Sequence, residues 1–341
     1  MSSISNNSSM TNTSAPQDSS NQSGRSTVDV DMVFFWLIII VGVVGNSLVI
    51  TVVKMIRSMR TATNYLLVNV AAADVTTLVF TAIHFLIRKI RPTSPKALLS
   101  FLCAFIYNNT IVIVTLLVTS LTMTLLAFER YHALVKPLIN SGRLTNGNIT
   151  YVITAIWVVA IAMVTPLFAG FSYDSTAGTC HADLEELAIY VSCLFIVLTF
   201  IPFIIIAYCY SQIVYGLYVK KTICSNKSER AETPEEAREK RRLVILLILL
   251  SVVFFTAFVP YGLLIILNFN RMKIAYLTGL RHVAQYLTLL SCSVNPFIYA
   301  FQSSSYRHSF NFLFKKLFRR DTTVNSLELI KMRTGTSLRT V

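Results

Sequence analysis

The sequence predicts an all-α membrane protein, a seven-transmembrane helix bundle with a short amphipathic helix after the last span. Of the 341 residues, 54% are hydrophobic and only 13% are charged, about half the charged fraction of a soluble domain. The mean hydropathy is +0.61. Seven long apolar segments account for these values, and Asp74 is the one charged residue inside any of them.

Each apolar segment is long enough to cross a bilayer as a helix, which takes about 20 residues. The segments are 33–53, 65–87, 97–128, 149–171, 187–218, 243–269 and 283–301. Helices buried in a soluble protein would be shorter and amphipathic. We therefore expect the bundle to occupy residues 33–301.

Basic residues are distributed unevenly between the connecting loops. Most of the 30 Lys and Arg residues follow the first, third and fifth segments or lie in the tail. Basic loops remain in the cytoplasm, so the pattern predicts a multi-pass plasma-membrane protein whose amino terminus is extracellular. The net charge of +14 then belongs to a cytosolic face beside anionic lipid, and nucleic-acid binding is not expected.

The two ends of the chain have different compositions. Residues 1–32 are rich in Ser, Asn and Thr, which predicts a disordered extracellular arm. Residues 302–320 form an amphipathic pattern typical of a helix on the membrane surface, and residues 321–341 are expected to be a disordered cytoplasmic tail. Glycosylation sequons in the arm lie at Asn6, Asn7, Asn12 and Asn21.

Of the six cysteines, only Cys103 and Cys180 lie near the predicted outer face. A disulfide between them would join the beginning of the third segment to the loop before the fifth.

Polar residues and prolines interrupt the apolar segments in a particular order. They are Asn46, Asp74, Glu129-Arg130-Tyr131, Trp157, Pro202 with Tyr210, Pro260, and Asn295-Pro296-Phe297-Ile298-Tyr299. In this order, one set per segment, they resemble the rhodopsin-like (class A) G-protein-coupled receptors over residues 33 to 318. The general pattern is similar to the neuropeptide-receptor branch of that family.

The resemblance implies a conformational switch at the cytoplasmic face. Glu129 would hold Arg130 in the resting state, and on activation Arg130 would extend toward the G protein. Further parts of this switch would be Tyr131, Tyr210, Phe254, Phe258, Pro260, Asn295, Pro296 and Tyr299.

The sixth segment has its own helix-start signal. Thr233-Pro234 is typical of a helix beginning, because Thr caps and Pro suits the first turn. The helix would run to about Asn268, with a kink at Pro260. Lys240 stands where many family members carry an acid, so repulsion from Arg130 predicts raised basal activity.

Asp74 is expected at mid-membrane depth, where a lone carboxylate is costly. Asn46, Thr119, Ser291 and Asn295 are the matching polar residues on other segments. The resemblance implies that this cluster binds an allosteric sodium ion, and oxygen ligands suit that hard cation. The alternative is a neutral, hydrogen-bonded structural Asp74.

The ligand is expected to enter from outside, between the outer halves of the segments. The seventh segment has no lysine for a retinal Schiff base, and Val112 replaces the acid of aminergic receptors. Cys103 lies 27 residues before Arg130 where the family has 25, so a two-residue bulge is expected between them. Candidate ligand contacts are His84, Asn108, Asn109, Val112, Tyr261, Asn268, Arg281, His282 and Gln285.

The predicted function is that of a G-protein-coupled receptor for a neuropeptide, and not an enzyme. Charged outer loops favour a peptide. Its partners would be a heterotrimeric G protein, arrestin and membrane lipid. A receptor for a non-peptide small molecule or lipid is the first alternative. A secondary transporter is the second, although the sequence shows no internal repeat of the kind that transporters carry.

Overall fold

The computed structural model describes residues 19–87, 96–107, 109–135, 144–145, 147–174, 179–182, 184–216, 234–269 and 277–318. Their elements are α1 (Ser19–Met55), η1 (Arg57–Met59), α2 (Ala62–Ile87), α3 (Lys96–Leu102), the π-helical turn η2 (Cys103–Tyr107), α4 (Thr110–Val135), α5 (Ile149–Ala169), β1 (Phe171–Asp174), β2 (Thr179–Ala182), α6 (Leu184–Val214), α7 (Pro234–Phe269), α8 (Leu277–Gln302) and α9 (Ser304–Phe318). The chain divides into two compact units, Met1–Leu37 and Ile38–Val341. The described part of the first unit is the beginning of α1.

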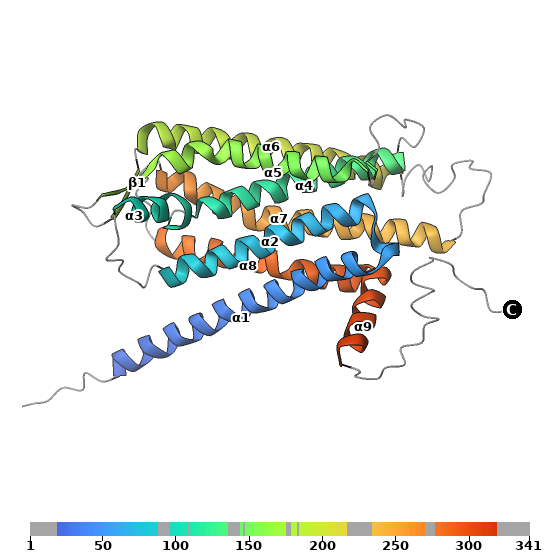
Figure 1. Ribbon diagram of the computed structural model, residues 1–341, viewed down its shortest axis with the longest axis horizontal. Coiled ribbons are helices and arrows are strands. Elements are labelled where there is room, and N and C mark those ends of the chain that lie inside the picture. The colour runs from blue at the N-terminus through green and yellow to red at the C-terminus, as the bar shows by residue number, and fades with distance from the viewer. Residues whose placement is uncertain are drawn as a thin grey trace, which may run out of the picture. The chain divides into compact units, whose positions relative to one another are not determined.

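The second unit is a bundle of long helices that run side by side (Figure 1). Helix α4 occupies its centre, since it packs against α2, α5, α6 and α7. Two clusters of buried apolar residues fill the interior. One, around Leu126, Tyr210 and Leu247, extends as far as α9, and the other, around Val118 and Val164, joins α4, α5 and α6.

Six stretches of the described chain are long and apolar enough to span a membrane, namely Asp31–Met55, Ala62–Ile87, Leu98–Val135, Ile149–Ala169, Leu187–Val214 and Ala237–Leu267. The third of them includes parts of α3, η2 and α4. Helix α8 contains the seventh predicted span, but it is not among the six stretches that are long and apolar enough to span a membrane. Its inner face carries Ser291, Ser293 and Asn295, which are buried. Its outer face is an apolar stripe of Leu280, Val283, Leu287, Leu290, Phe297 and Phe301. The helix therefore has a lipid-compatible face and a polar interior face.

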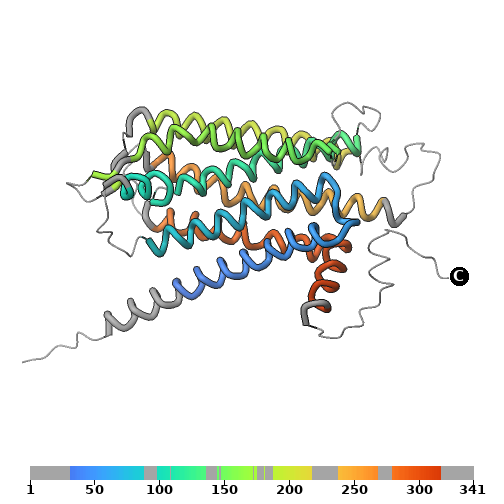
Figure 2. The backbone as a smooth tube through the Cα atoms, in the orientation of Figure 1, coloured from blue at the N-terminus to red at the C-terminus, as the bar shows by residue number. Residues whose placement is uncertain are grey.

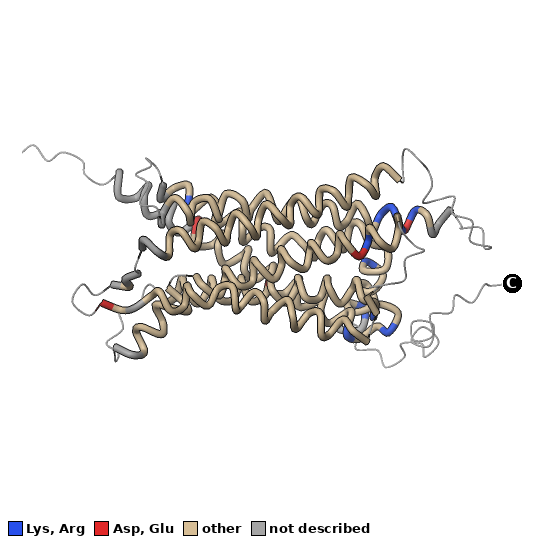
Figure 3. Tube along the Cα trace, turned by 90° about the horizontal axis from the view of Figure 1, so that it is seen from above, with Lys and Arg blue, Asp and Glu red and all other residues tan. Residues whose placement is uncertain are grey.

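The rest of the bundle has a similar outside. Large apolar side chains such as Val158, Ile189, Ile204 and Val252 are exposed. An apolar exterior suits a bilayer and not water. Charged residues of the described chain gather near the ends of the bundle, with most Lys and Arg at one end (Figure 3). We call this the Arg130 end, and the opposite one the disulfide end.

Several predicted boundaries need correction. Helix α1 begins at Ser19, whereas residues 1–32 were expected to be disordered, so the helix continues beyond the apolar part of the segment. The amphipathic helix, expected at 302–320, is α9, Ser304–Phe318, and α8 extends to Gln302. Helix α9 turns away from the direction of α8 (Figure 2). Residues 1–18 and the tail 319–341 lie outside the described part.

The fold is not purely helical. Strands β1 and β2 form an antiparallel hairpin in which Tyr173 pairs with Cys180. The Tyr173 N–H also donates to the Ser100 hydroxyl at 3.3 Å. This hairpin lies in the loop between α5 and α6, where the sequence predicted only the disulfide partner Cys180.

Local signals predicted the limits of α7 well. The helix begins at Pro234 and ends at Phe269, in agreement with the Thr233-Pro234 start and the end expected near Asn268. Proline at the first position of a helix loses no hydrogen bond, because that N–H has no intrahelical acceptor. Pro260 lies inside α7 and Pro296 inside α8.

Candidate functional site

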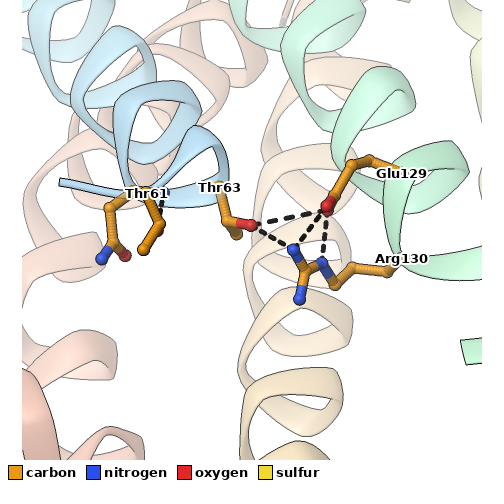
Figure 4. A network of polar contacts seen from close by, with 5 residues as sticks. Thr61, Thr63, Glu129 and Arg130 are labelled. Atoms are coloured by element: carbon orange, nitrogen blue, oxygen red, sulfur yellow. Dashed lines mark hydrogen bonds and ion pairs between the residues drawn. The ribbon is translucent and has the colours of Figure 1, made fainter. Parts of the chain in front are cut away.

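Arg130, in the last two turns of α4, is held by two neighbours. Its Nη2 donates to Glu129 Oε1 at 2.6 Å, and its Nε also donates to the Glu129 carboxylate. Nη2 makes a second hydrogen bond, to the Thr63 hydroxyl of α2. Figure 4 shows that Thr63 and Glu129 approach the guanidinium from different helices. The side chains of Arg130 and Glu129 are 17% and 11% exposed, so this is a partly buried ion pair.

The position of Thr63 follows from the start of α2. The Thr61 hydroxyl accepts a hydrogen bond from the Asn64 N–H at 3.3 Å, which is the usual geometry of an N-cap. The Asn64 side chain donates to the Met59 carbonyl at 2.7 Å. These bonds fix the first turn of α2, so that buried Thr63 faces α4. No pattern in the sequence indicated this contact between Thr63 and Arg130.

A cavity of about 470 Å³ lies at the Arg130 end. Residues from the η1–α2 link, α2, α4, α7 and the α8–α9 junction surround it, namely Ser58, Met59, Thr61, Thr63, Asn64, Leu67, Arg130, Glu239, Lys240, Arg242, Leu243, Leu246, Gln302, Ser303, Ser304, Ser305 and Tyr306. Its volume falls in the range of about 300–1,000 Å³ typical of ligand pockets. Arg130 therefore lines a space that another molecule can enter.

Two tyrosines join α8 to α9 beside this cavity. Tyr299, which is fully buried, stacks on Tyr306 with ring centroids 5.3 Å apart. The Tyr306 hydroxyl donates to Asn64 Oδ1 at 3.3 Å, and burial raises the pKa of Tyr306. The Tyr299 hydroxyl makes no direct hydrogen bond to another described residue. The sequence predicted a surface helix over residues 302–320 and did not indicate Tyr306 as a partner of Tyr299.

The other aromatic residues predicted for the switch are also inside the bundle. The Phe254 and Phe258 rings stack 5.1 Å apart in α7, six and two residues before Pro260. Buried Tyr210 faces Ser251 without a hydrogen bond of normal geometry. Tyr131 is buried and its ring lies 6.0 Å from that of Tyr208.

Polar residues predicted for an ion site meet in the middle of the bundle. The Asn295 amide donates to Asp74 Oδ2 at 2.7 Å. The Asn46 amide donates to the carbonyls of Gly42 and Cys292, at 2.9 Å each. Its own Oδ1 is buried and has no hydrogen-bond partner among the described residues. Thr119 and Ser291 are buried too, but no hydrogen bond joins them to Asp74 in the described part of the chain.

A second interior network was not predicted. The Trp157 indole N–H donates to Asn69 Oδ1 at 2.8 Å, and the Asn69 amide donates to the Thr122 hydroxyl at 2.8 Å. These two bonds join α2, α4 and α5. Trp157 is one of the residues that carry the family resemblance, yet no local pattern indicates Asn69 as its partner.

The predicted disulfide is confirmed at the opposite end. Cys103 and Cys180 are bonded, with their Cα atoms 5.6 Å apart. Cys103 opens the π-helical turn η2. Asn109, just before α4, has a left-handed φ of 54°, a conformation that Asn tolerates better than most residues. A π-turn accommodates extra residues, so the irregular backbone lies where the long Cys103–Arg130 spacing predicted a bulge.

The candidate ligand contacts differ in burial. His84 and Val112 are buried, Asn109, Tyr261 and Gln285 are half-buried, and Arg281 and His282 are exposed. Tyr261 lies beside Asn109 and near Arg281. Asn108 and the Asn268 side chain lie outside the described part.

The bundle also contains a small apolar slot, whereas the ligand contacts predicted from the sequence are mainly polar residues. Its volume is about 40 Å³, and it lies between α4, α5, α6 and α7. Its lining is Ile113, Leu116, Leu117, Leu167, Val191, Leu194, Phe195, Phe258, Tyr261, Gly262 and Ile265. Of the candidate contacts, only Tyr261 belongs to it.

The helix bundle has an apolar exterior, and at one end the ion-paired Arg130 lines a cavity. These features are typical of a membrane signalling protein. Residues 45–299 match the family model of the 7 transmembrane receptor (rhodopsin family). The match covers well over half of the chain, which therefore belongs to this family. It is a multi-pass membrane receptor and not an enzyme.

The chain is similar to several receptors over most of its length. Galanin receptor type 1 of Homo sapiens is 28% identical over 318 residues, covering 90% of this chain and 88% of that receptor. The substance-P receptor of Mus musculus is 26% identical, covering 89% and 76%. The tachykinin-like peptides receptor 86C of Drosophila melanogaster is 26% identical, covering 82% and 57%.

Proposed function

We propose that this receptor binds an extracellular peptide and activates a heterotrimeric G protein at the cavity beside Arg130. One observation carries the coupling part of the proposal: a guanidinium is held by Glu129 and Thr63 in the wall of a cavity. A charge-assisted pair of this kind keeps its geometry until a competing partner arrives. The similar receptors include the tachykinin-like peptides receptor 86C, whose name specifies peptides, and this supports a peptide ligand.

The orientation of the chain is part of this proposal. The amino terminus would be extracellular, with glycosylation at Asn6, Asn7, Asn12 and Asn21. The disulfide end would then receive the ligand, and the Cys103–Cys180 bond would fix the β1–β2 hairpin over the pocket. The apolar slot suits an apolar side chain of the peptide, because its lining offers little beyond hydrocarbon and aromatic surface.

Activation would move the inner end of α7 away from α4 and release Arg130 toward the G protein. Tyr210 and Tyr299 would then approach the vacated space with their buried hydroxyls. Lys240 of α7 lines the same cavity as Arg130 of α4, and the two positive charges repel. Helix α7 is therefore held against α4 less firmly than it would be with an acid at position 240. We therefore infer raised basal activity.

We also propose that the Asp74 cluster binds a sodium ion in the resting receptor. Buried oxygen atoms of Asp74, Asn46, Thr119 and Ser291 fit a hard cation. Asn295 would help to position the carboxylate that it already contacts. Replacing KCl by NaCl should raise the melting temperature of the purified receptor. An equal effect of the two salts, or a sodium effect that persists in Asp74→Asn, would contradict the site.

The remaining partners concern α9 and the tail. In α9, Tyr306, Phe310 and Leu313 pack inward while Phe314 is exposed beside exposed Arg307 and Lys315. This arrangement suits contact with anionic lipid. The tail would recruit arrestin once phosphorylated.

The function is tested by guanine-nucleotide exchange in membranes that contain the receptor and a promiscuous G protein. A peptide library should contain at least one member that stimulates exchange. The variant Arg130→Ala should still bind that peptide but lose the stimulated exchange. Full exchange by Arg130→Ala would refute the role of Arg130, and peptide-independent uptake of a solute without any exchange would refute the receptor function.

A further inference from the structure

A proline inside α6 leaves one backbone carbonyl without its usual donor. Pro202 lies within this helix, and proline has no N–H to donate to the carbonyl four residues earlier. That carbonyl belongs to Leu198, which is buried in the cluster around Val118 and Val164. A buried carbonyl without a hydrogen bond is costly. We therefore expect a group from another part of the chain to take the place of the missing N–H.

A side chain of α4 supplies this donor. The Ser120 hydroxyl donates to the Leu198 carbonyl at 3.2 Å, across 78 residues of sequence, and Ser120 is buried. A hydroxyl inside a helix often bonds to a carbonyl of its own helix. Thr124 does so one turn later in α4, where its hydroxyl donates to the Ser120 carbonyl at 2.9 Å. The Ser120 hydroxyl instead joins α4 to α6.

A second proline of the bundle has the same arrangement. Pro296 lies inside α8 and leaves the Cys292 carbonyl without an intrahelical N–H. The Asn46 amide of α1 donates to that carbonyl at 2.9 Å. In membrane helices, polar groups of neighbouring helices commonly satisfy the carbonyl that a proline releases. The bond from Ser120 to Leu198 is therefore the α6 counterpart of a contact that the chain also makes at α8.

The surroundings of this bond explain what it adds to the packing of α4 and α6. The two helices meet there through apolar residues such as Val118 and Leu194. Apolar contacts are non-directional, and lipid is as apolar as these side chains, so little drives the helices into one fixed register. A hydrogen bond requires the Ser120 hydroxyl to lie opposite the Leu198 carbonyl. It therefore fixes the position of α6 along α4.

The same part of α6 also lies against α7. The Phe195 and Phe258 rings have their centroids 5.6 Å apart, and those of Phe203 and Phe255 are 5.4 Å apart. Phe195 and Phe203 precede and follow Leu198 in α6. A movement of α7 would therefore act on the part of α6 that the Ser120 hydroxyl holds.

We propose that Ser120 is a positioning residue of the receptor, which holds α6 against α4 in the resting state through the carbonyl released by Pro202. Its effect on signalling rests on the proposed function, in which the inner end of α7 moves away from α4. Because α6 packs against α7 on both sides of Leu198, a bond that keeps α6 in its resting position also resists this movement. Loss of the Ser120 hydroxyl should therefore raise nucleotide exchange without a peptide.

The bond itself is tested by a double-mutant cycle on the purified full-length receptor in lipid nanodiscs. Ser120→Ala removes the donor and should lower the melting temperature. Pro202→Ala restores an N–H four residues after Leu198, so the carbonyl regains a donor in its own helix. In that background Ser120→Ala should lower the melting temperature by about half as much or less. An equal fall in both backgrounds would show that Ser120 does not serve the released carbonyl, and would overturn the proposal.

The effect on signalling is tested by nucleotide exchange without peptide, divided by the amount of receptor. Ser120→Ala should raise this rate roughly threefold, which corresponds to one average hydrogen bond between membrane helices. The control Thr124→Val removes a hydroxyl that bonds within α4 and should leave the rate unchanged. A purely structural role of Ser120 would lower the exchange with and without peptide together. That result, or equal rates in Ser120→Ala and Thr124→Val, would overturn the proposal.

Failure of the proposed function gives a different result. In that case every receptor, the wild type included, would lack nucleotide exchange with all peptides of the library. The melting-temperature cycle involves neither a peptide nor a G protein. It would still show whether the Ser120 hydroxyl holds α6 through the Leu198 carbonyl.

Discussion

The Thr63 hydroxyl of α2 accepts a hydrogen bond from the Arg130 guanidinium of α4, although 67 residues separate the two in the chain. The same hydroxyl lies 3.5 Å from the Glu129 carboxylate. Thr63 thus completes a small network that holds Arg130 within the bundle (Figure 4). Among the described residues, the acid that bonds to Arg130 is Glu129 of the same helix, while Glu239 and Lys240 of α7 line the cavity beside it.

Removing the Thr63 hydroxyl should therefore loosen Arg130. Hydrogen bonds to charged groups contribute about 1.5–3 kcal/mol, and solvent screening at this partly exposed site reduces the value to about 1 kcal/mol. Thr63→Val should raise the rate of nucleotide exchange without peptide roughly fivefold, when the rate is divided by the amount of receptor in the membrane. Thr63→Ser keeps the hydroxyl and should behave like the wild type. Equal exchange by the Val and Ser variants would show that Thr63 does not restrain Arg130.

A substitution at Lys240 should change basal nucleotide exchange in the opposite direction. Lys240→Glu would place an acid in the cavity that Arg130 lines, so attraction replaces repulsion between α7 and α4. We expect basal exchange to fall several-fold below the wild type, with Lys240→Gln in between. Exchange is measured without ligand at matched receptor levels. If Lys240→Glu is as active as the wild type, charge at this position does not control basal activity.

Gly262 of α7 lies directly against Phe195 of α6. A Cβ atom at this position would overlap the Phe195 ring, and this ring also lies 5.6 Å from that of Phe258. Overpacking costs about 1–3 kcal/mol, so Gly262→Ala should lower the melting temperature of the purified receptor.

The chain provides a matched control for this change. A Cβ at Gly279 of α8 would meet no atom within 4 Å, so Gly279→Ala should leave the melting temperature unchanged or raise it. Adding Phe195→Leu to Gly262→Ala should recover part of the loss. A Gly262→Ala receptor as stable as the wild type would show that Phe195 can move aside at little cost.

The interior network of Trp157 makes a fourth prediction. Trp157→Phe removes the indole N–H and leaves Asn69 Oδ1 without its donor. An unsatisfied buried acceptor costs about 1–3 kcal/mol, and the lost ring volume adds to this. The melting temperature should fall, and Asn69→Leu in the same receptor should add much less than it does alone. Strictly additive losses would indicate that the two residues are not coupled.

The sequence predicted well what depends on neighbouring residues. Runs of apolar side chains indicated the spans, and Thr233-Pro234 indicated the start of α7 at Pro234. The long interval between Cys103 and Arg130 predicted irregular backbone, which the structure shows as η2 and Asn109. Such signals are local because helix formation and capping involve residues a few positions apart.

Residues in the bundle interior were less predictable. The hydropathy of α8 is reduced by buried Ser291, Ser293 and Asn295, so its role as a span depends on which face meets lipid. The apolar slot is lined by side chains from four helices, and single apolar residues in a hydrophobic segment carry no signal of their own. Its lining could not be separated from ordinary lipid-facing or core residues.

By itself, the sequence determined a polytopic helical receptor, its disulfide, and an Arg130 paired with its neighbour Glu129. Only the tertiary structure decided that Thr63 holds the same guanidinium, that Tyr306 stacks on Tyr299, and that Lys240, Arg242 and the start of α9 border one cavity. The physical reason is that these contacts form between helices. Their partners are set by how side chains of distant segments pack together, and no periodicity within one segment contains that information.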